Sequence, residues 1–155
     1  LHNASTATRK SLSMCSRYPL LLALFLALPV AAEDHRQLAA LSPEAQATLR
    51  QEMLDNLIAL NEILSLVAAN KIKEAGEVAE NSLGRSAMGK NARLPFAHRP
   101  GPQMPPAMHD IGRGGHFAAS EFAAAAASGN RERALALLPN LTASCVGCHA
   151  AYRSR

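Results

Sequence analysis

The stretch SPEAQATLRQEMLDNLIALNEILSLVAA, residues 42–69, decides the fold class. It opens on Ser42-Pro43-Glu44, which is a capping side chain, a proline at the first helical position and an acid in the first turn. Apolar residues then recur in steps of three and four along one stripe, at Leu49, Met53, Leu57, Leu60, Leu64 and Val67. The sequence therefore predicts one long helix over residues 42–69, with Asn70 as its turn.

The rest of the chain offers further helices and one irregular connection. The additional predicted helices cover residues 71–83, 105–128 and 131–153. Gly76 weakens the pattern of the second helix, and Pro139 should kink the last one. Residues 84–106 are rich in Gly, Pro, Arg and His, which predicts a long connection. No alternating strand pattern is present, so the predicted fold class is all-α: an antiparallel four-helix bundle with a long loop between its second and third helices.

Residues 1–32 are predicted to lie outside the folded domain. A short basic head, residues 14–18, is followed by PLLLALFLALPVAA, an apolar core with small residues at its end, which is the pattern of a signal peptide cleaved after Ala32. The apolar run is shorter than the roughly 20 residues that a membrane-spanning helix needs. We therefore expect upstream residues and a signal peptide over 1–32, one domain over 33–155, and a periplasmic location.

The predicted domain is nearly balanced in charge. Arg9, Lys10 and Arg17 are three of the 16 basic residues, which leaves 13 bases against 12 acids after residue 32. This balance argues against a nucleic-acid-binding module. Residues 33–80 hold nine acids and four bases, whereas residues 85–113 hold five bases and one acid. Such asymmetry suits docking to a charged protein partner, although a solvated face explains it equally well.

The stretch CVGCHAAYR, residues 145–153, carries the chemistry. In an oxidising compartment Cys145 and Cys148 would be able to form one disulfide. A thioredoxin-like dithiol begins a helix in a sheet-containing fold, whereas this pair ends a helix. A structural zinc site wants four ligands, and no second Cys or His pair of matching spacing follows residue 32. C-x-x-C-H is the attachment pattern of c-type haem, in which both thiols bind vinyl groups and His149 is the proximal iron ligand.

The ending C-x-x-C-H-x-x-Tyr-Arg of an exported four-helix chain resembles the cytochrome c-prime family, the class II c-type cytochromes. At the level of motif the resemblance covers only the last ten residues and part of the first helix. It implies a left-twisted four-helix bundle with one covalent haem c between the helices near one end. Arg153 matches the basic residue that follows the family's proximal ligand. Many relatives have a tryptophan near the start of the third helix, and this chain has none.

The family that this chain resembles has two versions of the distal iron site, on the side of the haem opposite the proximal histidine. One version has an apolar residue and an open distal site, and the other has methionine and a closed, low-spin site. Met53-Leu54-Asp55-Asn56 resembles the first-helix segment of the methionine-ligated members. Met53 also lies on the predicted inward stripe, roughly 16 Å along the helix at 1.5 Å per residue. A thioether there suits His/Met ligation, and a methionine that only fills core space is the alternative.

Further residues are candidates for the haem pocket. The rivals of Met53 as a ligand are Met88, Met104, Met108 and His116. His116 is the most serious rival, because a histidine can ligate iron, donate to a propionate or a bound gas, or simply be satisfied within the protein. Arg50 is a candidate propionate partner through its planar guanidinium, with a solvated surface arginine as the alternative. Tyr152 and Arg153 are assigned to the pocket or the propionates as well.

These features predict an electron carrier and not an enzyme, since no catalytic nucleophile or acid–base pair stands out. We expect a monohaem cytochrome that passes one electron at a time between periplasmic or membrane-bound redox proteins. One alternative is a five-coordinate protein that binds NO or CO at an open iron, and another is a haem-free helical scaffold with a Cys145–Cys148 disulfide. A homodimer through the first two helices is expected on the resemblance alone.

Overall fold

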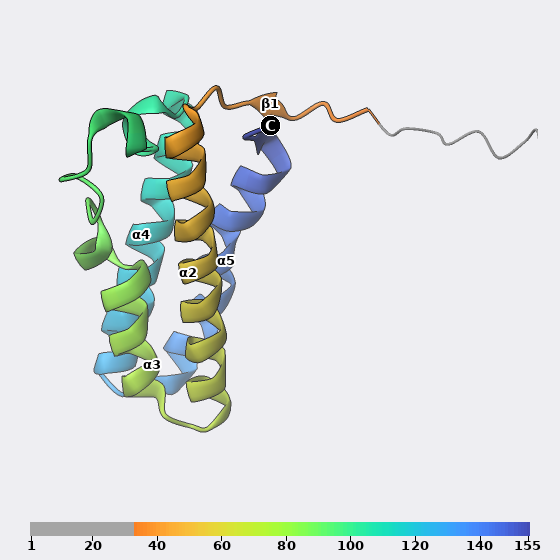
Figure 1. Ribbon diagram of the computed structural model, residues 1–155. Coiled ribbons are helices and arrows are strands. Elements are labelled where there is room, and N and C mark those ends of the chain that lie inside the picture. The colour runs from red at the N-terminus through yellow and green to blue at the C-terminus, as the bar shows by residue number, and fades with distance from the viewer. Residues whose placement is uncertain (1–32) are drawn as a thin grey trace, which may run out of the picture. The chain divides into compact units, whose positions relative to one another are not determined.

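The computed structural model describes residues 33–155. Along the chain it contains β1 (Gln37–Leu38), α2 (Pro43–Ala68), α3 (Ile72–Val78), η1 (Ala79–Leu83), η2 (Arg85–Ala87), η3 (Phe96–His98), η4 (Gly101–Gln103), α4 (Pro106–Ala127), α5 (Arg131–Ala151) and β2 (Tyr152–Arg153). Helices carry most of the described chain, which confirms the all-α prediction (Figure 1). Residues His35–Arg155 form one unit. The predicted signal peptide, residues 1–32, lies outside the described residues.

The helix ends follow the capping signals in the sequence. Ser42 caps α2, because its hydroxyl accepts a hydrogen bond from the Ala45 amide at 3.3 Å. The turn after α2 uses Asn70 at φ +60°, and the turn after α4 uses Gly129 at φ +75°. The Asn130 side chain then caps α5. The predicted helices over residues 42–69, 105–128 and 131–153 are therefore confirmed to within two residues.

The second predicted helix, residues 71–83, is built in two parts. α3 ends at Val78, and the chain continues into a π-helical turn, η1. Gly76, which weakened the prediction, has a packing role: a Cβ at this position would lie 2.7 Å from the Cβ of Ala126 in α4. The glycine therefore allows α3 and α4 to approach each other closely.

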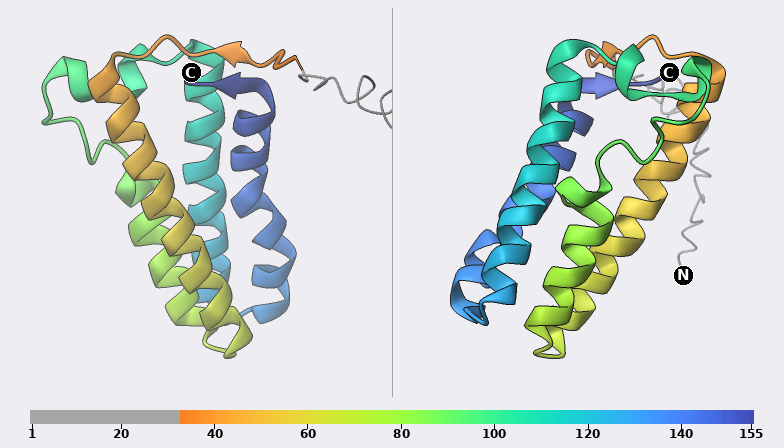
Figure 2. Two further views of the ribbon diagram at one scale, coloured as in Figure 1. Left: turned by 45° about the vertical axis from the view of Figure 1, so that its right-hand side comes forward. Right: turned by 90° about the vertical axis from the view of Figure 1, so that its left-hand side faces the viewer.

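Consecutive helices are neighbours, and α4 and α5 share the most extensive contact (Figure 2). The main core cluster consists of Ile63, Val67, Ala75, Ala79, Ala119, Phe122, Ala123, Ala125, Ala126, Ala134 and Leu141. The alanine-rich stretch of α4 contributes four small side chains to this cluster, those of Ala119, Ala123, Ala125 and Ala126, which pack against the neighbouring helices.

The buried face of α2 differs from the predicted stripe. The buried residues of α2 are Ala45, Leu49, Ala59, Ile63 and Val67. Met53, Leu57 and Leu64 of the predicted stripe are instead exposed, by 38%, 62% and 48%. The prediction of a single inward stripe is wrong at these three positions. Periodicity identifies an apolar side of a helix, but the neighbouring helices decide which edge of that side is covered.

Two short strands were not predicted. β1 pairs in parallel with β2, so that Gln37 lies opposite Tyr152 and Leu38 opposite Arg153. A strand of two residues is too short for alternation to reveal it in the sequence. The pairing joins the segment before α2 to the residues that directly follow α5 (Figure 2).

Candidate functional site

The C-x-x-C-H motif lies in the last turns of α5, next to β2. Cys145 is exposed, Cys148 is half-buried, and both are free thiols. His149 is exposed, and its backbone carbonyl accepts a hydrogen bond from Arg36 Nη1 at 3.3 Å. Residues three apart on a helix share a face, so both sulfurs project from the same side of α5.

Cys148 and Tyr152 pack against a second cluster of buried residues. This second core cluster consists of Ala39, Leu41, Ala45, Leu49 and Met108, with Met104 also packed against it. Its members come from the segment before α2, from α2 itself and from the first turn of α4. The fold therefore brings the N-terminal parts of α2 and α4 to the end of α5 that carries the motif.

A band without buried residues separates the two core clusters. No residue is buried over residues 50–58 of α2, 109–118 of α4 or 142–151 of α5. The bands on α4 and α5 lie at the same level, because a Cβ on Gly115 would come within 2.4 Å of the Ser144 hydroxyl. A Cβ on Gly112 would meet no atom within 4 Å. Three helices thus leave side chains uncovered at the level of the motif, and we call this region the open band.

Met53 lies in the open band on α2, one helical turn beyond Leu49 of the second core cluster. The other methionines lie elsewhere. Met108 is only 6% exposed and belongs to the second core cluster, whereas Met88 is 39% exposed in the connection before α4. The contacts therefore place Met108, and not Met53, in the cluster against which Cys148 packs.

His116 is engaged in a backbone contact. Its Nδ1 lies 2.7 Å from the carbonyl oxygen of Leu83 and 3.1 Å from that of Gly84. A carbonyl oxygen only accepts, so Nδ1 carries the proton and donates. His116 thus joins α4 to the end of η1.

The remaining predicted pocket residues divide into two groups. Tyr152 and Arg153 are half-buried beside the motif, where they form β2. Arg50 is exposed, and its Nη2 donates to the Gln46 side chain of the same helix at 3.4 Å. The structure thus brings Tyr152 and Arg153 to the motif and leaves Arg50 at the surface of α2.

The electrostatics of the Cys148 thiol do not suit a reactive dithiol. Burial raises the pKa of the Cys148 thiol, and the neighbouring Cys145 raises it further. A dithiol that exchanges disulfides needs a lowered thiol pKa, which the N-terminus of a helix helps to provide. These thiols lie at the opposite end, where the helix dipole disfavours negative charge.

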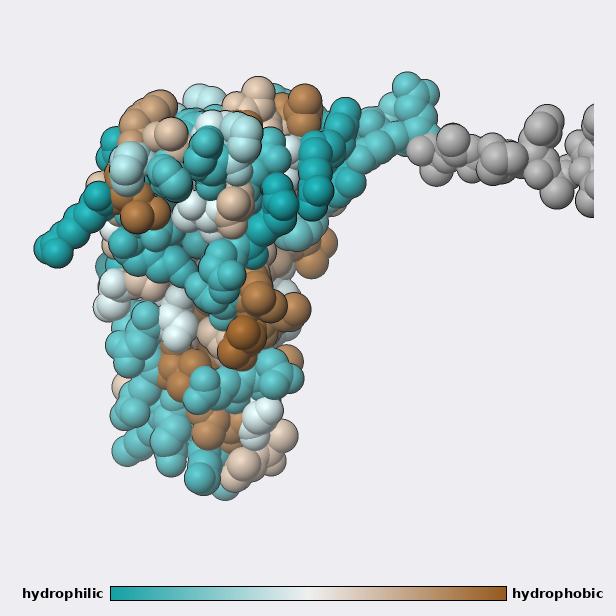
Figure 3. Space-filling view, viewed as in Figure 1, coloured by the Kyte–Doolittle hydropathy of each residue, from teal (hydrophilic) through white to brown (hydrophobic). Residues whose placement is uncertain are grey.

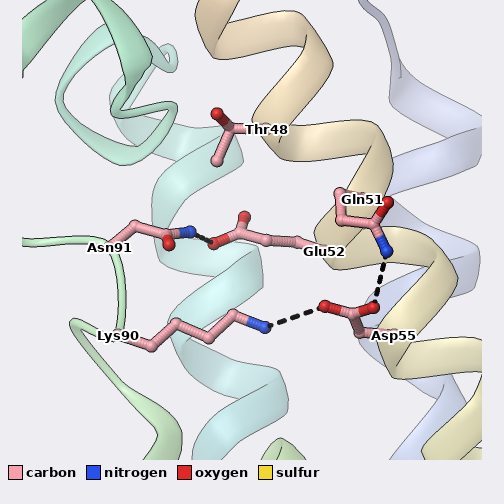
Figure 4. A pocket seen from close by; sticks show the side chains of 6 residues that line it. All are labelled: Thr48, Gln51, Glu52, Asp55, Lys90 and Asn91. Carbon is pink, nitrogen blue, oxygen red and sulfur yellow. Dashed lines mark hydrogen bonds and ion pairs between the residues drawn. The ribbon is translucent and has the colours of Figure 1, made fainter. Parts of the chain in front are cut away.

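A polar pocket of about 200 Å³ lies where the connection before α4 crosses α2. It is lined by Thr48, Gln51, Glu52, Asp55, Lys90 and Asn91 (Figure 4). The Asn91 side chain donates to the Glu52 carboxylate, and Lys90 Nζ lies 3.9 Å from Asp55. These contacts fasten the connection to α2 at the residue before Met53. Sequence analysis did not find them, because they join residues that are far apart in the chain and follow no motif.

Glu52 has a perturbed carboxyl group within this pocket. Burial raises its pKa above the ordinary value, and Lys90, the hydrogen bond from Asn91 and His116 offset part of that rise. Asp55 adds to the rise through like-charge repulsion. The lining residues are all polar or charged, which suits water and ions better than the face of a porphyrin. Three of them, Gln51, Glu52 and Asp55, belong to the α2 part of the open band.

α5 has an unusual combination of composition and exposure. Within residues 33–155 it alone is long and apolar enough to cross a membrane, yet only 11% of its most apolar window is buried. A helix that packs on a large apolar group passes the same test of length and composition as a helix that spans a membrane. Among these residues no group of three or more His, Cys, Asp and Glu side chains is arranged to hold a metal ion.

The chain matches no family model, and comparison with curated proteins and with solved structures finds no significant similarity.

Proposed function

We propose that this protein is an exported, periplasmic c-type cytochrome with one covalent haem, and that it transfers single electrons. The observation that carries the proposal is a C-x-x-C-H motif at the end of α5, at the level of a band in which three helices leave side chains uncovered. Cys145 and Cys148 would hold the haem, and His149 would supply one axial nitrogen. The haem supplies reversible one-electron exchange at its iron when bound.

The residues of the open band fit a large apolar ring. α2 presents Met53 and Leu57, which are 38% and 62% exposed, and α5 presents Val146, which is 66% exposed. α4 contributes Gly112, where even an added Cβ would meet no atom within 4 Å. Covering these apolar side chains with a ring would remove them from water, which is favourable.

We assign the sixth ligand to Met53. Its support is its place in the open band and its uncovered side chain. Met108, a rival in the cluster on which Cys148 packs, is already enclosed there. Ligation by histidine and methionine raises the reduction potential and is typical of electron-transferring cytochromes.

The proposal includes the finer architecture, an antiparallel four-helix bundle with a long loop between the second and third helices. It is supported by the short turns at Asn70 and Gly129 and by the irregular connection over residues 84–105. In such bundles cofactors are held between side chains of facing helices.

Expression of the full chain with a cytochrome maturation system tests the proposal. We expect a coloured product whose haem resists acid extraction, and loss of that attachment in Cys145→Ala/Cys148→Ala. A colourless wild-type protein would overturn the assignment.

The same preparation tests the sixth ligand. Reduced wild-type protein should show sharp low-spin bands, and Met53→Ala should convert them to a broad high-spin Soret band. Met108→Ala is the matched control and should keep the low-spin bands. A spectrum unchanged by Met53→Ala would remove Met53 from the ligand set.

The second candidate function is binding of NO or CO at an open iron. The observation that favours it is the separation of Met53 from the cluster on which Cys148 packs. Rapid binding of CO to the reduced wild-type protein, with no effect of Met53→Ala on its rate, would establish this alternative.

The proposed partners are periplasmic or membrane-bound redox proteins and a second copy of this chain. α2 exposes Leu54 by 50% and Ile58 by 58%, and apolar side chains gather over α2 in the middle of the molecule (Figure 3). A homodimer through α2 and α3 would cover them. Light scattering should give twice the chain mass for the wild type and the monomer mass for Ile58→Glu, with Glu62→Gln on the same helix as control.

A further inference from the structure

The segment before α2 is held against the end of α5. β1 pairs with β2, and the amide of Ala39 donates to the carbonyl of Arg153 at 2.8 Å. Ala39 is 0% exposed and Leu41 is 7% exposed, although both precede the first helix. A segment with paired backbone and buried side chains has a fixed position.

A contact from the same segment reaches the motif itself. Arg36 Nη1 donates to the carbonyl of His149 at 3.3 Å. The last four carbonyls of a helix have no partner within the helix, so this hydrogen bond satisfies one of them, and the guanidinium places positive charge at the negative end of the helix dipole. The hydrogen bond acts at His149, and the strand pairing begins three residues later at Tyr152.

This end of α5 has few other contacts with the core, apart from Ser144 beside Gly115 of α4. Beyond Leu141 no residue of α5 is buried, and the second core cluster contacts it through Cys148 and Tyr152. Helix ends that lack buried contacts open easily. Because Ala39 also belongs to the second core cluster together with Leu49, the same segment connects the end of α5 to α2.

We propose that residues 36–39 are a clamp that positions the last turn of α5, and that Arg36 is a positioning residue for His149. The clamp keeps this turn helical and fixes its distance from α2. Its effect on haem rests on the proposed function, whereas its effect on the polypeptide does not.

Amide hydrogen exchange of the full chain tests the clamp with or without haem. Ala39→Pro removes the donor to Arg153, and Ala39→Gly keeps it. Arg36→Met removes the donor to His149, and Arg36→Lys keeps a donor and the charge. We expect exchange over residues 145–153 to become faster than in the matched controls, by about tenfold in Ala39→Pro and about twofold in Arg36→Met. These two values are the upper and lower ends of the range that the loss of one hydrogen bond predicts. Exchange over residues 119–126, in the main core cluster, should not change.

Unchanged exchange over residues 145–153 in both variants would overturn the clamp. So would a rise no larger there than over residues 119–126, because that outcome indicates general destabilisation. In coloured protein, Arg36→Met should also shift the midpoint potential, and Arg36→Lys should restore it. A colourless protein with the expected exchange pattern would refute the haem assignment and leave the clamp standing.

Discussion

His116 Nδ1 donates to the carbonyl of Leu83 at 2.7 Å, and this contact joins α4 to the end of η1. The sequence made this residue a candidate ligand, yet in the structure one of its ring nitrogens donates to backbone carbonyl groups. His116→Ala should leave the carbonyls of Leu83 and Gly84 without this donor and lower the free energy of unfolding by about 1–2 kcal/mol.

Urea denaturation measures this loss. His109→Ala, an exposed histidine of the same helix, is the control and should change stability by less than about 0.5 kcal/mol. Equal stability of the two variants would contradict the structural role of His116.

Ser120 links two segments one turn further along α4. Its hydroxyl donates to the Glu80 carboxylate at 2.5 Å and accepts from the Arg85 amide at 2.9 Å. Hydrogen bonds from Ser120 and Ser86 lower the pKa of Glu80. Because the pKa of Glu80 is lowered in the folded state, its carboxylate stabilises the fold at pH values above its ordinary pKa. That stability is lost as the pH falls through the folded-state pKa.

Ser120→Ala should therefore cost about 1–2 kcal/mol at neutral pH and less in acid, where Glu80 is protonated in both states. Denaturation at neutral and acid pH measures the difference. Ser65→Ala, whose hydroxyl bonds only a carbonyl of its own helix, is the control. An equal loss at both pH values would show that the Glu80 carboxylate is not involved.

Glu52 gives the opposite dependence on pH. Burial raises its pKa, so the folded protein is favoured while Glu52 is protonated, and this contribution is lost as the pH rises through the folded-state pKa. Glu52→Gln keeps an acceptor for Asn91 without the charge, and should stabilise the protein at pH 7 with a flatter pH profile. The free energy of unfolding between acid and neutral pH checks this. Glu62→Gln, at an exposed position of α2, should leave the profile as in the wild type.

Gly76 tests the close approach of α3 and α4. Alanine favours helix over glycine by up to about 1 kcal/mol, but here its Cβ would lie 2.7 Å from Ala126 and 3.1 Å from the Ala123 carbonyl. Gly76→Ala should therefore destabilise the protein by about 1–3 kcal/mol, since overpacking outweighs propensity.

Gly114→Ala is the matched control for Gly76→Ala. A Cβ on Gly114 would meet no atom within 4 Å, so this variant should gain up to about 1 kcal/mol of stability. Thermal unfolding distinguishes the two glycines by the sign of the change. A gain in stability in both variants would mean that α3 and α4 do not need the glycine.

The sequence by itself determined the helices over residues 42–69, 105–128 and 131–153 and their ends. Ser42 before Pro43, the positive φ of Asn70 and Gly129, and the prolines after residue 94 act on the adjacent backbone, so local pattern is sufficient to find them. The motif at Cys145, Cys148 and His149 was equally visible, because its chemistry depends on spacing along the chain.

The tertiary structure alone decided which surfaces of those helices are covered. It turned Ala59 and Ile63 of α2 inward in place of Leu57 and Leu64, and it paired the segment at Ala39 with the end of α5. These outcomes depend on contacts between residues far apart in the sequence. The spacing of apolar residues along one helix shows which side of it is apolar. Which residues on that side are buried depends on where the neighbouring helices lie.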